Sequence, residues 1–410
     1  MHPIVFRIPL PHWTLPFGIG ELHALPIYSY GVMLGLSFVV GWYLTLGLIK
    51  RDFTAAYNEA TGLAFVEKFA NCYVVTAFSA LLASRLLYVV TNLDEFHTLK
   101  DLFALRRGGL VAYGGFLGGF VGSLAYLRII RVRLLPWADA AVPSLASGLM
   151  ITRIGCYLFG CDFGKPLTGA APEWLKTLGT FPHWPEGTLD HGSGSPAWVH
   201  HVQHRGLGME SVASFPVHPT QLYESAVGLS LLVLLLWVRR QQKFRGQIFL
   251  VFTFGYGLLR FLLEMLRDDV ERGEYGPSMA EHVILPGALA ALALAYAVGI
   301  APTLKEVVLR RVTQVAAFVP AVVAYLVLRP ETFGEQSLVQ LSTSQWVALL
   351  TAVPAAIAYG IYAKAAAAHP GSAMTLGLEG MQIVADAEPA AGGHEADDAD
   401  DADKAAPGAS

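Results

Sequence analysis

The chain has 410 residues, of which 54% are hydrophobic and only 15% are charged, and its formal net charge is −4. Soluble domains carry about 25% charged residues, so this composition, with a mean hydropathy of +0.47, excludes an ordinary soluble protein and indicates a polytopic membrane protein. The three cysteines lie in or beside apolar runs, which excludes a disulfide framework. We expect no nucleic-acid partner.

Apolar runs of the length needed to span a membrane recur along the whole chain. A helix needs about 20 such residues to cross a bilayer core of about 30 Å. The candidate spans are 27–49, 69–91, 110–127, 137–160, 222–238, 246–265, 280–301, 314–328 and 346–363. The fold class predicted is an all-α polytopic membrane protein with a seven-span core, about two extra C-terminal spans and a small outward-facing head.

Basic residues set the expected orientation, because short cytoplasmic loops carry an excess of Lys and Arg. They follow the first, third, fifth and seventh spans, beginning with Lys50, Arg51 and Lys68 after the first. We therefore expect the N-terminus outside, the C-terminus in the cytoplasm, and a bacterial inner membrane as the location. The domains expected are a membrane domain over 1–301 with a periplasmic head at 161–217, two added spans at 302–366, and a disordered Ala/Asp-rich tail at 367–410.

Three arginines, Arg85, Arg153 and Arg260, each lie inside an apolar run. A charge at bilayer depth costs at least roughly 2.5–3.5 kcal/mol, so an anionic partner within the membrane is expected, and a lipid phosphate is the commonest. Arg recognises phosphate through two parallel hydrogen bonds, so Arg153 and Arg260 are predicted to clamp one phosphodiester. Glu264 lies four residues after Arg260, on the same helix face. The alternative is a structural pair with a nearby acid.

Glycines and tyrosines accompany these arginines. Gly114 and Gly115 would let a lipid approach the backbone closely, although such pairs are more often helix-packing sites. Tyr30, Tyr113 and Tyr256 would supply hydroxyl groups at depth, although tyrosines near a helix end are more often interface anchors. His200, His201 and His204 form an HHVQH cluster, which is more typical of a polar head surface than of a metal site. We expect no metal and no cofactor.

Five segments taken in order resemble one family, the prolipoprotein diacylglyceryl transferases. They are YG at 30–31, GGLVAYGGFLGG at 108–119, RIGCYLFGCDFGKP at 153–166, HPTQLYE at 218–224 and GYGLLRFLLEMLRDD at 255–269. The similarity covers about residues 26–300. It implies transfer of the diacylglyceryl group of phosphatidylglycerol to the lipobox cysteine of a prolipoprotein, which gives a thioether and glycerol phosphate.

The resemblance also implies roles for single residues. Arg153 and Arg260 match the phosphate-binding arginines, and Tyr30, Tyr256, Gly164 and Glu264 match positions tied to activity. The catalytic residues we expect are Arg153, Arg260, Tyr113, Glu264 and Tyr30. The substrate-binding residues we expect are Arg153, Arg260, Tyr256, Gly164, Arg85, Gly114, Gly115 and His218.

Three positions depart from the family pattern. Tyr113 stands where many members have His, Cys156 follows RIG where many have Asn, and Cys161-Asp162 stands where some have Glu. A tyrosine, with a usual pKa near 10, is a poor base at neutral pH, so Tyr113 is expected to donate a hydrogen bond to the lipid. The candidates for accepting the thiol proton are Glu264, a tyrosine acting through water, or the phosphate itself.

Two other functions fit part of the sequence. A transporter or flippase for an anionic lipid would explain arginines within the membrane, but no internal repeat is visible and the polar motifs lie near one face of the membrane. A non-catalytic homologue would explain the changes at Tyr113 and Cys156. Nothing in the added spans at 302–366 has a catalytic pattern, so a partner surface or simple packing is expected there.

Overall fold

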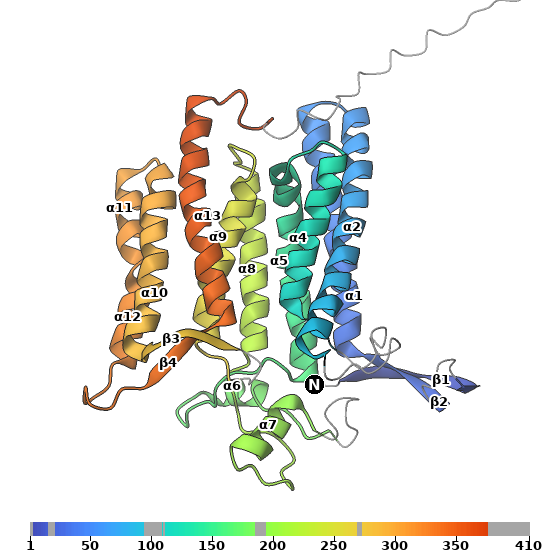
Figure 1. Ribbon diagram of the computed structural model, residues 1–410, viewed down its shortest axis with the longest axis vertical. Helices are drawn as coiled ribbons and strands as arrows, with labels where there is room; N and C mark the ends of the chain where they lie inside the picture. Colours follow the sequence, from blue (N-terminus) through green and yellow to red (C-terminus); the bar gives the residue numbers. More distant parts are fainter. Residues whose placement is uncertain are drawn as a thin grey trace, which may run out of the picture.

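The computed structural model describes residues 3–14, 21–93, 109, 111–184, 194–268 and 273–375. Most of these residues lie in long, roughly parallel helices (Figure 1). Of the tail expected at 367–410, residues 376–410 lie outside the described residues, and α13 continues to Ala368. In the described part, eight helices or helix pairs are long and apolar enough to cross a membrane. The chain is therefore an all-α polytopic membrane protein.

The helices follow the predicted spans in order. Their bounds are α1 (Ser29–Ala56), α2 (Glu59–Thr91), α4 (Ala112–Ile129), α5 (Leu134–Phe159), α8 (Thr220–Arg239), α9 (Gln247–Glu264), α10 (Glu281–Ala295), α11 (Val307–Ala316), α12 (Val319–Leu328) and α13 (Thr343–Ala368). Helix α10 continues through a π-helical turn over Tyr296–Ile300 and a 3-10 turn over Ala301–Thr303. Helix α4 coincides with the expected third span but falls outside the eight, since its many glycines lower its hydropathy.

Two boundaries differ from the prediction. The loop expected around Lys50, Arg51 and Lys68 is wrong, because α1 and α2 continue beyond the apolar runs and leave only two residues between them. Asn58 caps the start of α2, and its side chain accepts a hydrogen bond from the Thr61 backbone N–H at 2.8 Å. Such a cap satisfies one of the free N–H groups at a helix start, so the helix begins well before its apolar stretch.

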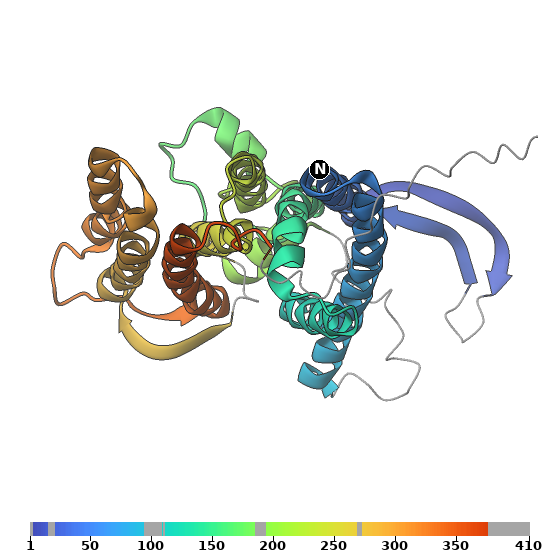
Figure 2. The ribbon, with the colours of Figure 1, turned by 90° about the horizontal axis from the view of Figure 1, so that it is seen from above.

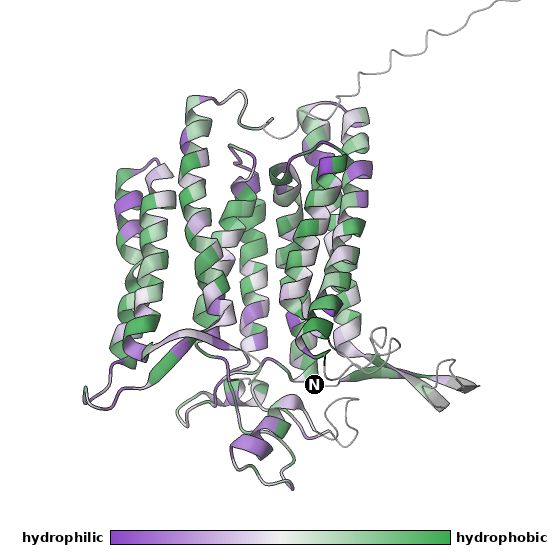
Figure 3. Ribbon diagram, viewed as in Figure 1, coloured by the Kyte–Doolittle hydropathy of each residue, from purple (hydrophilic) through white to green (hydrophobic). Residues whose placement is uncertain are grey.

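The helices form three neighbouring groups when seen along their axes (Figure 2). In the first group, α1 packs against α2 and α5, and α4 packs closely against α2. Helices α8 and α9 pack against α5 and against each other. Helices α10 and α12 pack against each other on the side of the bundle opposite α1 and α2. Helix α13 lies between α9 and α10 and contacts both. Apolar residues cover the middle of the helices, and polar residues gather at both ends and in the small head (Figure 3).

The head and two short sheets lie at one end of the bundle. The head contains α6 (Glu173–Leu178) and α7 (Pro196–His204), and it connects the end of α5 to the start of α8. Strands β1 (Ile4–Thr14) and β2 (Glu21–Tyr28) pair antiparallel just before α1. Strands β3 (Glu274–Ala280) and β4 (Leu338–Ser342) pair antiparallel just before α10 and α13. Strands β2, β3 and β4 therefore each lead into a membrane helix from the head side.

The expectation of a polar head surface is wrong for His201. This side chain is fully buried, and its Nδ1 accepts a hydrogen bond from the Phe215 backbone N–H at 3.2 Å. Burial, aided by nearby positive groups, lowers the pKa of His201 to about 4. A neutral imidazole thus belongs to the core of the head, whereas His200 lies 4.0 Å from an Asp268 carboxylate oxygen.

Candidate active site

Arg153 and Arg260 lie on different helices, and one carboxylate joins them. Glu224, in the second turn of α8, pairs through Oε2 with Nε of Arg153 on α5 and through Oε1 with NH1 of Arg260 on α9, the latter at 2.9 Å. The Glu224 side chain is only 3% exposed. Helices α5, α8 and α9 pack side by side, so this bridge fixes the two guanidinium groups relative to each other.

Glu264 holds Arg260 from the same helix. Its Oε2 lies 2.7 Å from NH2 of Arg260, and the Glu264 side chain is 1% exposed. This contact is the one expected from the spacing of four residues. Arg260 is therefore held by two buried carboxylates, one on its own helix and one on the neighbouring helix.

A third carboxylate lies where α5 ends. The helix stops at Gly160, which has a positive φ of 84°, and the chain turns through Asp162, which has a φ of 56°. The Asp162 carboxylate lies 2.7 Å from NH1 of Arg153 and also pairs with Arg267. Burial alone would raise the pKa of Asp162, but the guanidinium groups of Arg153 and Arg267 outweigh it and hold that pKa well below its usual range.

Gly164 lets three backbone segments meet beside this carboxylate. Its N–H donates to the His218 carbonyl at 3.0 Å, and it forms a bridge with Arg267. A Cβ at this position would lie 2.7 Å from the Leu266 carbonyl oxygen and 2.8 Å from Cβ of His218, distances that only a glycine avoids. The expected residues Gly164 and His218 therefore help to position the Asp162 turn.

Tyr113 joins the site from a further helix, α4, and Tyr256 joins it from α9. The Tyr113 hydroxyl, in the first turn of α4, lies 2.9 Å from Oγ of Ser344, and this same Oγ accepts a hydrogen bond from NH2 of Arg260 at 3.0 Å. Tyr256 lies one turn before Arg260 on α9, so the two share a helix face. The structure thus brings Tyr113, Tyr256, Arg153, Arg260 and Glu264 together.

Tyr30 approaches the same end of α5 from the start of α1. A Cβ on Gly155 would lie 3.3 Å from Cα of Tyr30 and 3.4 Å from its ring. Gly155 is two residues after Arg153. The absence of a side chain at Gly155 therefore lets Tyr30 pack onto the turn of α5 that carries Arg153.

Arg85 has different contacts. Its NH1 donates to the Gly109 carbonyl at 3.0 Å, and its guanidinium carbon lies 5.5 Å from the centre of the Tyr88 ring. Ser84, next to it, accepts from the Val111 backbone N–H through its carbonyl at 3.2 Å and donates through Oγ to the Val111 carbonyl at 2.8 Å. These contacts link the start of α4 to α2. A role of Arg85 in substrate binding stays a prediction.

The two expected glycines of α4 face α2 to different degrees. A Cβ on Gly114 would lie 2.5 Å from the Ala83 carbonyl oxygen, whereas a Cβ on Gly115 would lie no closer than 3.7 Å to Ala80. Gly114 therefore permits the close packing of α4 on α2 that brings Tyr113 to its position. Gly115 has only an ordinary contact there.

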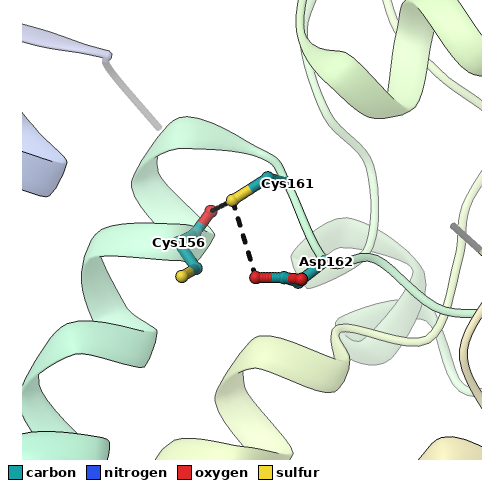
Figure 4. A group of neighbouring side chains, drawn as sticks. All are labelled: Cys156, Cys161 and Asp162. Atoms are coloured by element: carbon teal, nitrogen blue, oxygen red, sulfur yellow. Dashed lines mark hydrogen bonds between the residues drawn. The ribbon is translucent and has the colours of Figure 1, made fainter. Parts of the chain in front are cut away.

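Cys156, Cys161 and Asp162 form a compact group whose ligand atoms lie within 4.8 Å of one another (Figure 4). The Cys161 sulfur lies 3.9 Å from the Cys156 carbonyl oxygen and 3.8 Å from the Asp162 carboxylate. A metal ion there would have to compete with two guanidinium groups already paired with that carboxylate. The donor set therefore fits an ion-pair network better than a cation.

The network combines three arginines, Arg153, Arg260 and Arg267, with three carboxylates, Glu224, Glu264 and Asp162. Its formal charges balance. Sequence reasoning singled out Arg153, Arg260 and Glu264, and it named Asp162 only as a departure from the family pattern. It missed Glu224, Arg267 and Ser344. Glu224 gave a usable signal, since it is a charged residue near the start of an apolar run; Ser344 gave none.

Comparison with known proteins relates the chain to one family. A model of the prolipoprotein diacylglyceryl transferase family matches residues 18–297. A phosphatidylglycerol–prolipoprotein diacylglyceryl transferase of Clostridium perfringens is 30% identical over 262 residues, which are 63% of this chain and 85% of the relative. One of Clostridium tetani is 30% identical over 253 residues, 61% of this chain and 84% of the relative. One of Clostridium botulinum is 26% identical over 256 residues, 62% and 85% respectively.

Proposed function

Since this chain belongs to the prolipoprotein diacylglyceryl transferase family, we propose that it transfers the diacylglyceryl group of phosphatidylglycerol to the lipobox cysteine of prolipoproteins. The observation that carries the proposal is the pair of guanidinium groups of Arg153 and Arg260, held together by Glu224. Two arginines from neighbouring helices at one depth are suited to bind a single lipid phosphodiester. The site lies at the head end of the helices, beside the Asp162 turn.

The reaction is a displacement at the glycerol carbon that bears the phosphate. A bond forms between this carbon and the cysteine sulfur, and the bond to the phosphate oxygen breaks. Glycerol phosphate leaves with one more negative charge, and the thiol proton is lost. Arg153 and Arg260 would stabilise the growing phosphate charge, an effect that is larger in a water-poor site than in water.

The other residues have supporting roles in this proposal. Glu224, Glu264 and Asp162 orient the arginines before the lipid binds. Tyr113, Tyr256 and Tyr30 supply hydroxyl groups to lipid or peptide oxygens. Candidate acceptors for the thiol proton are Glu264, a tyrosine hydroxyl acting through water, and the departing phosphate oxygen. Much of the remaining rate gain comes from holding two membrane-bound substrates in one orientation.

We further propose the setting of the reaction. The N-terminus and the 161–217 head face the periplasm, and the C-terminus faces the cytoplasm, as the distribution of basic residues indicates. The site then opens toward the outer leaflet of a bacterial inner membrane, where a secreted prolipoprotein presents its lipobox cysteine.

The test uses purified protein in detergent, phosphatidylglycerol and a lipobox peptide, with peptide mass and released glycerol phosphate as readouts. We expect a diacylglyceryl group on the peptide cysteine and at least a hundredfold lower rate for Arg153→Ala and for Arg260→Ala. Arg329→Ala is the matched control, since Arg329 is exposed just after α12. Folded protein that binds the lipid but transfers nothing would refute the enzyme and favour a non-catalytic homologue.

A further inference from the structure

Helix α13 lies beyond the part of the chain that matches the family model, which ends at residue 297. It nevertheless packs directly on α9, the helix that carries Arg260. A Cβ on Gly257 of α9 would lie 2.8 Å from Cβ of Ala352 and 3.2 Å from the Ala348 carbonyl oxygen. The added helix is therefore pressed against a helix of the site, one turn away from Arg260.

The start of α13 is fixed firmly. Ser342 and Gln345 form a reciprocal cap, in which the Gln345 N–H donates to Ser342 Oγ at 3.2 Å and the Ser342 N–H donates to Gln345 Oε1 at 3.0 Å. Thr343 N–H donates to the Gly273 carbonyl at 3.0 Å, and strand β4 ends against β3 at the same point. Such a cap satisfies two otherwise free N–H groups. Ser344, inside this cap, has a defined position.

The Ser344 hydroxyl lies between two site residues from different helices. It accepts a hydrogen bond from NH2 of Arg260 at 3.0 Å and lies 2.9 Å from the Tyr113 hydroxyl. A guanidinium group can only donate hydrogen bonds, so the Ser344 oxygen accepts the one from Arg260. The single proton of the Ser344 hydroxyl then remains available for a second hydrogen bond. When Ser344 donates that proton to Tyr113, the phenol keeps its own proton for an anionic oxygen of a ligand.

We propose that Ser344 is a positioning residue that links Arg260 to Tyr113 and orients both toward the phosphate of the lipid substrate. The added C-terminal helix thereby completes the site from outside the family-matched part of the chain. Ser344 contributes a neutral hydroxyl and so leaves the charge balance of the ion pairs unchanged. This inference rests on the proposed function, because the ligand that it orients toward is the lipid phosphate.

The test measures transfer from phosphatidylglycerol to a lipobox peptide by wild type, Ser344→Ala, Ser344→Thr, Tyr113→Phe and the double variant Ser344→Ala/Tyr113→Phe. We expect kcat to fall about tenfold in Ser344→Ala, as for loss of a hydrogen bond to a charged group, and to be largely restored in Ser344→Thr. The double variant is expected to lose little more than the worse single variant, because both changes break one chain of hydrogen bonds.

Thr351→Val is the matched control, because its exposed hydroxyl lies on the same helix and donates to the Val347 carbonyl at 2.7 Å. Its rate is expected to equal that of wild type. Wild-type activity in Ser344→Ala, or losses that multiply in the double variant, would overturn the positioning role and leave the transferase function intact. Absence of transfer by wild type would instead overturn the proposed function.

Discussion

Replacing Glu224 by Gln tests the central feature of the site, the single carboxylate that holds two arginines. Its Oε1 lies 2.9 Å from NH1 of Arg260, and its Oε2 pairs with Arg153. Two unit charges at this separation attract by roughly 6 kcal/mol at an effective dielectric constant of about 20. The cost of removing both charges from water offsets part of this attraction. Measured losses on removing one member of a buried ion pair are about 3–5 kcal/mol.

Gln keeps the shape of Glu and one acceptor oxygen, so we expect the lower end of that range, about 3 kcal/mol. If this loss affects the reacting state alone, kcat falls roughly a hundredfold. The KM for phosphatidylglycerol should stay equal or decrease, because the two guanidinium groups lose a competing anion. Glu224→Gln should therefore lower kcat and not lipid binding.

The assay combines initial rates over a series of lipid concentrations with a thermal unfolding curve for each variant. Glu173→Gln is the matched control, since Glu173 lies on the head helix α6 and its side chain is 85% exposed. A folded Glu224→Gln protein whose kcat stays within about threefold of wild type would refute the reasoning. So would a variant that raises KM with kcat unchanged, because the carboxylate would then act on binding alone.

Two further predictions concern the head end of the site. Gly164→Ala should reduce the transfer rate more than tenfold, because the new Cβ would lie 2.7 Å from the Leu266 carbonyl oxygen. Gly169→Ala is the control and should keep the normal rate, because Gly169 has open space around it. Equal rates for the two variants would contradict this prediction. Because burial lowers the pKa of His201 to about 4, the unfolded head binds a proton more readily than the folded head, so head stability should fall as pH drops from about 6.5 to about 4. Fluorescence of the buried Trp198, followed during acid titration, measures this, and His201→Gln should flatten the profile.

The sequence allows the membrane helices to be predicted because a span needs a long apolar run, and that signal is local. The pair of Arg260 and Glu264 is equally local, since the spacing of four residues puts both side chains on one helix face. The structure bears out this contact at 2.7 Å. Features that depend on a single segment could therefore be predicted.

The pairings between residues of different segments could not be predicted, even where one residue, such as Glu224, gave a signal of its own. Glu224 reaches both arginines only because α8 packs beside α5 and α9, and sequence spacing does not reveal this neighbourhood. Ser344 lies 84 residues from Arg260 along the chain, in a segment without any catalytic pattern. The two-stranded sheets were also missed, since β1 contains two prolines and β3 one, and proline is unusual inside strands.

Charge balance explains how this cluster at the head end of the membrane helices can hold three arginines. A lone guanidinium in the bilayer is costly, but each of the three is paired with a carboxylate. An incoming phosphate cannot simply add to such pairs; it must take over hydrogen bonds that the carboxylates hold. Only a group with negative charge at the same place can do so without leaving the guanidinium groups unpaired. Glu224 is therefore expected both to orient the arginines and to select for an anionic headgroup.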